Sequence, residues 1–303
     1  MTDKSKNQNN EYFVSVIIPV FNDSKRLELC LSALENQSYP ENLYEVIVVD
    51  NGSNDNPEKI INCHKNAKLS QESRRGSYAA RNKGISVAKG SIIAFTDSDC
   101  IPESDWIEMG VKNLSGIPNC GLLGGKIELF FADPSKPTGV ELWESLVAFQ
   151  QHKYIDIRKY AATANAFTFR SVIGKVGDFN AELLSSGDRE WGNRVHSLGY
   201  KLIYSDNTIV GHPARRTLKE LYSKHKRIVT GHYKLNITDS SAKTLLIESI
   251  PPVSSMIRLS RYSKFRQIDG PINKCKVLFV FVFMRYLRVW QRLRLKLSFK
   301  SRI

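Results

Sequence analysis

Residues 91–102 read SIIAFTDSDCIP, and this stretch decides the fold. An apolar run typical of a buried strand ends in two carboxylates, Asp97 and Asp99, with Ser98 between them. Burying a charge costs free energy unless the charge is paired. Carboxylates at this position therefore predict a strand end that opens onto a polar site.

Two earlier stretches end in the same way. VSVIIPV at 14–20 runs into the turn-forming FNDS, and YEVIVVD at 44–50 ends in Asp50 before NGS. Between them, leucines from Leu27 to Leu34 recur at helical spacing, and Gly90 looks like the stop of a second helix. This alternation of strands and helices predicts a parallel sheet covered on both faces, with its ligand beyond the carboxyl ends of the strands.

The pattern is less regular after residue 120. CGLLGGKIELFF predicts a strand, and GVELWESLVAFQQHKYI at 139–155 predicts one amphipathic helix. Residues 163–183 predict a strand, a short helix and a loop, and residues 185–213 predict a capped helix followed by a strand. From Ala214 onward we expect helices of increasing basicity.

Composition narrows the class of protein. Hydrophobic residues make up 42% of the 303 residues, enough for a real core, and an aromatic content of 10% argues against a disordered chain. The polar start has no apolar signal stretch, and the five scattered cysteines have no metal-type spacing. We expect a cytoplasmic protein whose thiols are reduced and mostly packed in the core.

The formal charge of +14 lies mainly at one end of the chain. Residues 256–303 contain thirteen lysines and arginines and one acid, so they carry +12 and leave +2 for the other 255 residues. A basic tail on a near-neutral body predicts an anionic partner for the tail. No recognition module accompanies the tail, so nucleic acid is not expected to be that partner.

The tail includes the uninterrupted apolar run 277–284, whose eight residues are too few for a spanning helix of about 20. A helix here would place Tyr286, Val289, Trp290, Leu293 and Leu297 on one side and Arg285, Arg288, Arg292 and Lys296 on another. Such a helix can lie in the headgroup layer of an anionic membrane. The alternatives are an edge strand over LRLKLSFK, an internal packing helix, or a dimer face that would make the protein a homo-oligomer.

The carboxylates suggest chemistry, and each has a plainer alternative. Asp97 and Asp99 can hold a divalent cation that bridges a diphosphate, or one of them can cap the next helix. Asp50 can accept hydrogen bonds from a nucleotide or close an Asx-turn. Asp188, in SSGDREWGNRV, can be a general base or, like Ser186, a helix cap.

Two basic residues have the same double interpretation. Arg81, in AARNKGI, can reach a nucleotide or be a solvated helical charge. His212, in IVGHPARR, follows a short strand and can be a metal ligand, although a lone histidine is more often structural.

Four stretches taken in order resemble family 2 glycosyltransferases of the GT-A fold: VSVIIPVFND, VIVVDNGSND, AARNKGISVAKGSIIAFTDSDCIP and SGDREWGNRVHSLGY. The resemblance implies an α/β fold in which helices flank a mixed, mainly parallel, Rossmann-like sheet. The domains we expect are a disordered lead-in at 1–12, a GT-A domain at 13–215 and a basic helical C-terminal region at 216–303. Within the GT-A domain, 13–120 would form the nucleotide-sugar half and 121–215 the acceptor half.

The resemblance also implies a function. It is the inverting transfer of a sugar from a nucleotide-diphosphate sugar to a hydroxyl of a glycan or lipid-linked acceptor, in cell-surface polysaccharide synthesis. Carried over by position, the residues that bind the nucleotide sugar would be Pro19, Asn22, Asp50, Arg81, Asp97 and Ser98. The ligands of Mg²⁺ or Mn²⁺ would be Asp99 and His212, and the tail would hold the enzyme on the inner face of the plasma membrane.

In the resemblance, Asp188 is the base that deprotonates the acceptor hydroxyl. The family commonly has Glu-Asp before this helix, whereas Gly187 precedes Asp188 here, and GDREW resembles a variant that recurs in bacterial members. Glu190 is the rival for the role of base. Asp188→Asn is expected to abolish most turnover.

Two other functions are compatible with this fold class. A nucleotidyltransferase would need a glycine-rich phosphate loop after the first strand, and PVFNDSKR contains no glycine. A non-catalytic scaffold that binds a nucleotide sugar or a membrane would not need Asp50, Asp97, Asp99 and Asp188, all of which are present.

Overall fold

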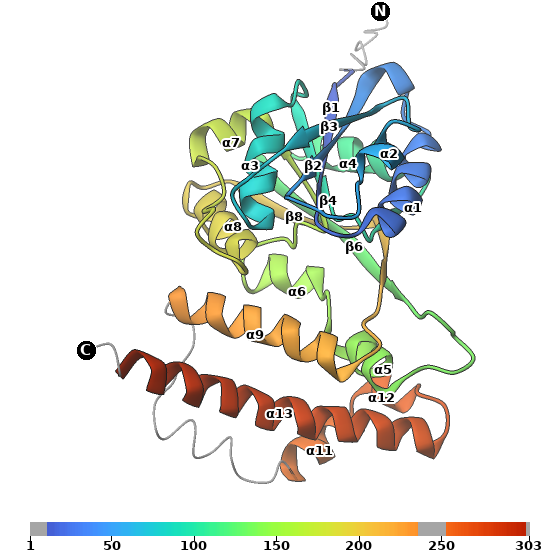
Figure 1. Ribbon diagram of the computed structural model, residues 1–303, viewed down its shortest axis with the longest axis vertical. Helices are drawn as coiled ribbons and strands as arrows, with labels where there is room; N and C mark the ends of the chain where they lie inside the picture. The colour runs from blue at the N-terminus through green and yellow to red at the C-terminus, as the bar shows by residue number, and fades with distance from the viewer. Residues whose placement is uncertain (1–10, 236–252, 301–303) are drawn as a thin grey trace, which may run out of the picture.

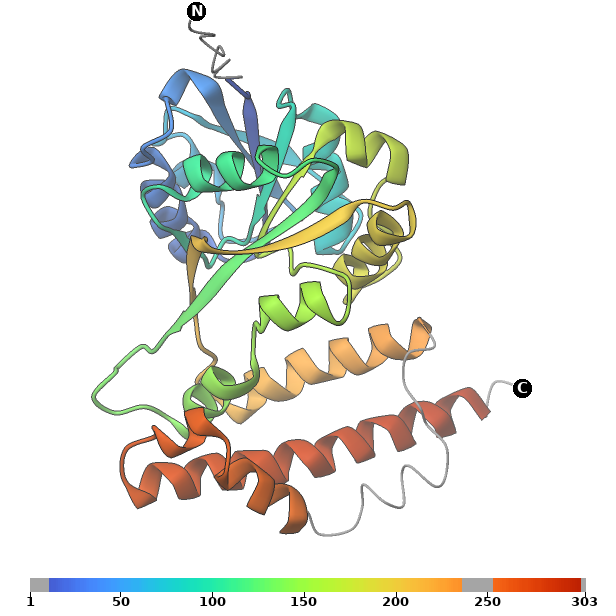
Figure 2. The ribbon, with the colours of Figure 1, turned by 180° about the vertical axis from the view of Figure 1, so that it is seen from behind.

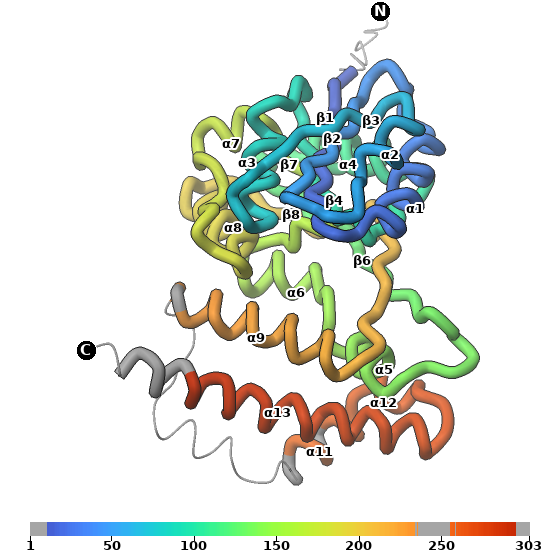
Figure 3. The backbone as a smooth tube through the Cα atoms, viewed as in Figure 1, coloured from blue at the N-terminus to red at the C-terminus, as the bar shows by residue number. Residues whose placement is uncertain are grey.

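The computed structural model describes residues 11–235 and 253–300, which are coloured in Figure 1, and Figure 3 draws the path of the backbone as a smooth tube. All but two residues of the expected lead-in at 1–12 lie outside the described residues. The described chain forms a sheet with helices on both faces, and a layer of helices that lies across one end of this body (Figure 1).

The sheet has eight strands in the order β3-β2-β1-β4-β7-β6-β8-β5. Strands β1 to β4 run parallel, β7 is antiparallel to both of its neighbours, and β6 and β8 are parallel to each other. The predicted mixed, mainly parallel sheet is therefore confirmed. The strands are β1 Val14–Val20, β2 Tyr44–Asp50, β3 Ala67–Gln71, β4 Ile92–Thr96, β5 Ile101–Pro102, β6 Cys120–Phe130, β7 Asn165–Phe169 and β8 Lys201–Pro213.

The strand order reverses at β1, and this reversal creates a crevice. β1 pairs with β2 along its whole length, whereas its pairing with β4 ends at Ile17 and Phe95. Beyond that point the two strands separate toward Pro19 and Asp97. In open α/β sheets the ligand site lies at such a switch point, outside the carboxyl ends of the strands.

Helices cover both faces of the sheet. On one face, α1 and α4 pack against Val14, Val16 and Ile18, whereas α3, α7 and α8 pack on the opposite face with Ile17. The predicted leucines of α1 are buried as expected for a helix with one apolar side. The helices are α1 Ser24–Glu35, α2 Glu58–Ile61, α3 Ser77–Val87, α4 Trp106–Ser115, α5 Gly139–Val147, α6 Gln151–Asp156, α7 Arg170–Val176, α8 Gly187–Ser197, α9 Leu218–Lys234, α11 Val253–Ser260, α12 Ser263–Arg266 and α13 Pro271–Lys300, with a 3-10 turn at Glu41–Leu43.

A third apolar cluster holds the helical layer together. It joins α5, α9, α12 and α13, with Trp143, Leu221 and Val277 among its buried members. α9 and α13 lie side by side across the layer (Figures 1 and 2). The long strands β6 and β8 extend toward this layer and lead into α5 and α9 (Figure 2), which fixes the layer next to the strand ends.

Two local predictions were wrong. The expected single helix at 139–155 is broken, because Ala148 is extended and Phe149 has a φ of +47°. Gly90 is not a helix stop: α3 ends at Val87, and a Cβ at Gly90 would lie 2.5 Å from the backbone nitrogen of Ser15. Gly90 is therefore required by a close approach of two backbones.

The basic tail is helical, so the edge-strand alternative for LRLKLSFK is wrong. Val277, Val280, Met284 and Leu287 are buried in the third cluster, as the packing-helix alternative predicted. The opposite side of α13 exposes Ile272, Phe279, Tyr286, Trp290 and Leu293, which we call the α13 stripe. Across residues 11–235 and 253–300, the structure contains no helix with the length and apolar character needed to cross a bilayer.

Candidate active site

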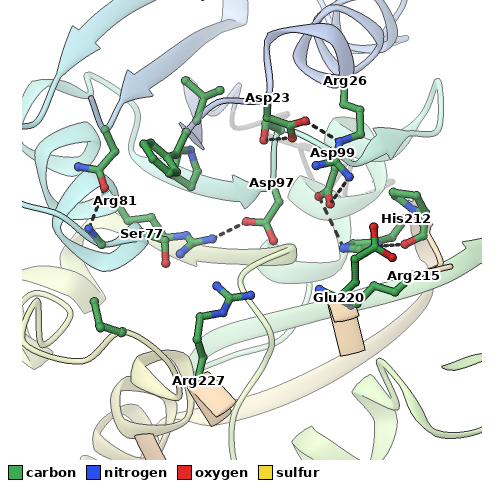
Figure 4. A pocket seen from close by; sticks show the side chains of 18 of the residues that line it. Asp23, Arg26, Ser77, Arg81, Asp97, Asp99, His212, Arg215, Glu220 and Arg227 are labelled. Carbon is green, nitrogen blue, oxygen red and sulfur yellow. Dashed lines mark hydrogen bonds and ion pairs between the residues drawn. The ribbon is translucent and has the colours of Figure 1, made fainter. Parts of the chain in front are cut away.

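A pocket of about 730 Å³ opens at the switch point between β1 and β4. We call it the strand-end pocket. The ends of both strands line it together with α3, the end of β8 and α9 (Figure 4). Of the predicted residues it contains Pro19, Arg81, Asp97, Ser98, Asp99 and His212.

Asp99 and His212 face each other in this pocket. The Nε2 atom of His212 lies 3.6 Å from Oδ1 of Asp99, and the imidazole is only 4% exposed. Nδ1 lies 2.8 Å from the carbonyl oxygen of Pro213. When Nδ1 donates to that carbonyl, Nε2 keeps its lone pair toward Asp99, which is the arrangement of a histidine metal ligand.

The chemistry of these donors fits a divalent cation. The Sγ of Cys100 completes a group of three possible ligand atoms within 4.8 Å of one another. Burial raises the pKa of the Cys100 thiol well above its ordinary value, which disfavours the thiolate that metals bind. The remaining carboxylate and imidazole suit Mn²⁺, which accepts both oxygen and nitrogen ligands.

Asp23 and Arg26 also belong to this site, and the sequence analysis missed both. Arg26 lies 3.5 Å from Asp99 through Nη1 and 2.5 Å from Asp23 through Nε (Figure 4). Ser98 donates its hydroxyl to the second oxygen of Asp23 at 2.8 Å. Burial raises the pKa of Asp23, while the hydrogen bonds from Arg26 and Ser98 oppose that rise. Ser98 therefore orients a carboxylate.

Arg81 is a buried partner for Asp97, so the solvated-charge alternative is wrong. Its Nη2 donates to Asp97 at 2.5 Å, and the residue is 3% exposed on the inner side of α3. Its neighbour Asn82 exchanges two hydrogen bonds with the backbone of Phe179. The structure thus places Arg81 against Asp97, the other predicted nucleotide-sugar residue at the end of β4.

Asp50 and Asn22 lie apart from the metal-type ligands. Asp50 accepts a hydrogen bond from the backbone N–H of Ser53 and lines a separate, smaller pocket beside β3. Asn22, at a φ of +52°, accepts from the backbone N–H of Asn54. Both side chains hold the turn after β2, which is the Asx-turn alternative for Asp50. Neither Asp50 nor Asn22 is one of the described residues that line the strand-end pocket.

Asn51 is a further residue that the sequence analysis missed. Its amide donates to the carbonyls of Glu72 and Arg74, and its oxygen accepts from Gly76 N–H at 2.7 Å. These bonds fix the loop that carries Arg75, whose guanidinium lies 4.2 Å from the ring centre of Phe21. The motif DNGS contained the signal, because a buried asparagine needs backbone partners.

Asp188 lies in an adjoining pocket of about 630 Å³, which we call the basic pocket. The basic pocket and the strand-end pocket share Phe149. Oδ1 of Asp188 accepts from the N–H of Arg189 at 2.9 Å and from the hydroxyl of Tyr78 at 3.3 Å. Burial raises the pKa of Asp188, Arg81 and these hydrogen bonds lower it, and Asp97 raises it. Asp188 is therefore electrostatically coupled to the strand-end pocket.

The unusual Gly187 has a steric cause. A Cβ at this position would lie 2.7 Å from the ring of Tyr78, so the ring occupies the space of a side chain. Ser186 has a φ of +66° and makes no capping hydrogen bond, so the predicted serine cap is wrong.

Glu190 is engaged elsewhere. Its two oxygens accept from Nε and Nη2 of Arg194 at 2.7 and 3.1 Å, and Arg194 also donates to the backbone carbonyls of Val176 and Asp178. Glu190 is not among the residues that line either pocket. This geometry gives Glu190 a structural role and leaves Asp188 facing the cavity.

The site thus combines a pocket at a switch point, a carboxylate–imidazole pair and a half-buried aspartate, Asp188, in the adjoining pocket. Comparisons with known proteins identify the family to which a chain with this site belongs. The family model "Glycosyl transferase family 2" matches residues 15–175. A glycosyltransferase of Haloferax volcanii, AglE, is 39% identical over 232 residues, which are 75% of each chain. The chain belongs to glycosyltransferase family 2 and is a glycosyltransferase.

Other relatives and structures are more distant. A dolichyl N-acetyl-α-D-glucosaminyl phosphate 3-β-D-2,3-diacetamido-2,3-dideoxy-β-D-glucuronosyltransferase of Methanococcus voltae is 23% identical over 221 residues, 69% of each chain. The mannosyltransferase PcManGT of Pyrobaculum calidifontis, solved with GDP-Man and Mn²⁺, is 17% identical with a TM-score of 0.63. That match covers 93% of this chain and 86% of the other, and it shows the GT-A fold.

Proposed function

We propose that the enzyme transfers a sugar with inversion from a nucleotide-diphosphate sugar to a hydroxyl of a glycan or lipid-linked acceptor. The observation that carries this proposal is the placement of Asp188 beside a pocket that contains the Asp99–His212 pair. A donor held by its diphosphate in the strand-end pocket would present its sugar toward the basic pocket. An acceptor hydroxyl next to Asp188 would then face that sugar.

Asp99 and His212 would hold Mn²⁺ or Mg²⁺. When bound, the cation would neutralise negative charge on the leaving diphosphate. Arg26 and Arg227 line the same pocket, and Arg227 points into it from α9 (Figure 4). Both guanidinium groups can therefore add positive charge near the phosphates. The complex of PcManGT with GDP-Man and Mn²⁺ supports a divalent cation at the donor site of this fold.

Asp188 would accept the proton of the attacking hydroxyl. Help of this kind from a positioned base contributes about 10²–10⁴-fold to the rate. Burial raises the pKa of Asp188, and a base with a higher pKa accepts a proton more readily. Tyr78 and the N–H of Arg189 fix the orientation of the carboxylate.

A lipid-linked acceptor and a membrane surface fit the remaining features. The name of the Methanococcus voltae relative describes transfer to a dolichyl phosphate-linked sugar. In this chain the α13 stripe exposes Phe279 and Trp290 by 63% and 60%. Aromatic residues on a helix rich in arginine and lysine favour the headgroup layer of an anionic membrane. We infer that α13 holds the enzyme on such a surface, near its acceptor.

The test is donor turnover. The purified enzyme is incubated with each common nucleotide-diphosphate sugar and Mn²⁺ or Mg²⁺, and release of nucleoside diphosphate is measured with and without EDTA. We expect metal-dependent release from at least one donor, faster when an acceptor is added. Donor binding without any release would instead favour the non-catalytic scaffold.

A further inference from the structure

The basic pocket contains more positive charge than deprotonation of a hydroxyl needs. Among the described residues, its lining contributes five basic side chains and two carboxylates: Arg158, Arg189, Lys224, Arg288 and Arg292, with Glu144 and Asp188. Cations beside a base stabilise its ionised form and so weaken its affinity for a proton. A second role for these cations is therefore expected.

The cations come from four separate parts of the chain and converge. Arg158 follows α6 and Arg189 lies in the first turn of α8. Lys224 is on α9, and the other two arginines are on α13. Two histidines lie among them. Burial lowers the pKa of His232, and Arg189, Arg158 and Arg292 lower it further. Burial, Arg288 and Lys224 likewise lower the pKa of His225 to about 4.

The carboxylate of Glu144 is already paired, so it does not neutralise the arginines of the basic pocket. It is 1% exposed and accepts hydrogen bonds from Lys224 at 2.7 Å and from both the backbone N–H and the Nη1 of Arg215. Glu144 thus links Lys224 of the basic pocket to Arg215 of the strand-end pocket. The Nε atom of Arg189 is buried and has no hydrogen-bond partner among the described residues. A buried donor without an acceptor is costly, and a bound anion would satisfy it.

The same pocket has an apolar side. This side consists of residues from α9 and α13, which lie side by side, and one residue at the end of α5: Leu221, Ile228, Val229, Phe281, Met284 and Val147. α9 approaches the Asp188 segment closely, since a Cβ at Gly231 would lie 2.5 Å from the carbonyl oxygen of Ser185. The pocket therefore offers cations next to Asp188 and an apolar surface that leads toward the helical layer.

We propose that the basic pocket binds the phosphate or diphosphate group of the acceptor, with Arg158 and Arg189 as its ligands and the apolar side against the attached lipid chain. This inference deepens the proposed function and rests on it. Guanidinium groups bind phosphate oxygens with two parallel hydrogen bonds, which fixes an acceptor relative to Asp188. The donor diphosphate has its own site at Asp99 and His212, and of the lining residues the two pockets share Phe149 alone.

The test is isothermal titration calorimetry with farnesyl diphosphate, farnesol and inorganic pyrophosphate. The titrations contain EDTA, so that the proposed cation site does not contribute. We expect farnesyl diphosphate to bind more tightly than either of the other two, because it alone offers both the anion and the chain. Equal binding of pyrophosphate would overturn the role of the apolar side, and equal binding of farnesol would overturn the phosphate site.

Variants assign the binding to the arginines. Arg158→Gln and Arg189→Gln should each weaken farnesyl diphosphate binding on the order of 10- to 100-fold, as expected for loss of a charged hydrogen bond. Lys226→Gln is the matched control, since Lys226 is exposed on α9 and outside the pocket lining. Thermal melting checks that each variant is folded. If one of the two arginine variants does not fold, the other still tests the site.

Unchanged affinity in both folded variants would overturn the proposal. Donor turnover without an acceptor is measured separately, because it depends on the strand-end pocket. Turnover with unchanged farnesyl diphosphate binding in the variants rejects the acceptor site alone. Absence of turnover for every donor rejects the proposed function, whatever farnesyl diphosphate does.

Discussion

Tyr78 on α3 donates its hydroxyl to Oδ1 of Asp188 on α8 at 3.3 Å, and its ring fills the space beside Gly187. The ring also stacks on Phe179, with centroids 5.8 Å apart. One aromatic residue thus sets both the position and the hydrogen bonding of the proposed base.

Tyr78→Phe should therefore alter the pH dependence of transfer. The hydroxyl lowers the pKa of Asp188, so its removal should raise that pKa further. Asp188 must be ionised to accept a proton, and the acidic limb of kcat/KM should move to higher pH while the plateau changes little. An acidic limb that stays in place would show that Tyr78 does not act on the catalytic group.

His212→Gln should weaken cation binding. The substitution removes the imidazole whose Nε2 faces Asp99 at 3.6 Å. We expect the affinity for Mn²⁺ to fall by at least about 10-fold, measured by electron paramagnetic resonance titration with a nucleoside diphosphate present. His196→Gln is the control, because His196 is exposed and outside both pockets. Equal Mn²⁺ affinity in the two variants would remove His212 from the site.

Glu144→Gln should destabilise the protein. Glu144 is buried against Arg215 and Lys224, and its removal would leave two cations without their carboxylate. Breaking a buried pair in this way costs about 3–5 kcal/mol. Urea denaturation should show the loss, whereas Glu28→Gln on the exposed side of α1 should have little effect. A loss below about 1 kcal/mol would show that the Glu144 cluster is well solvated.

The cluster also predicts how stability changes with pH. Burial lowers the pKa of Lys224 to about 8, from an ordinary value of 10.5. Between these values the unfolded chain binds more protons than the folded chain, so this group makes stability rise with pH from about 8 to 10.5. Lys224→Met should remove that rise in a pH series of urea denaturations. A rise that persists in Lys224→Met would assign it to another group.

The α13 stripe gives a prediction about membranes. The double variant Phe279→Ser/Trp290→Ser should reduce flotation with phosphatidylglycerol liposomes by on the order of 10-fold or more, because two large apolar side chains are lost. Leu198→Ser removes an exposed apolar residue that follows α8 and serves as control. Equal flotation of the two variants would place the membrane contact elsewhere.

The sequence was sufficient where the information is local. A buried strand followed by a carboxylate can be recognised from neighbouring residues, so the strand ends at Asp97 and Asp99 were predicted correctly. The helical spacing of Leu27, Leu31 and Leu34 likewise gave the buried side of α1.

The sequence was insufficient where the position of a side chain depends on segments that are far away in the chain. Nothing near Phe149 indicates that its backbone turns to place the ring 4.5 Å from that of His212. Arg288 and Arg292 follow a helical pattern that looks like a solvated side, yet they line the basic pocket together with residues of α9. Asp50 has the same strand-end position as Asp97, but its carboxylate closes its own turn. Local pattern does not distinguish these cases.

The most direct measurement compares the transfer rates of Asp188→Asn and Glu190→Gln at saturating donor and metal. Both carboxylates lie in the first turn of α8, but only Asp188 lines a pocket, whereas Glu190 is paired with Arg194. We predict a loss of about 10²–10⁴-fold in kcat for Asp188→Asn with donor affinity retained, and a near-parental rate for Glu190→Gln. A parental rate in Asp188→Asn, or the larger loss in Glu190→Gln, would contradict the assignment of Asp188 as the base.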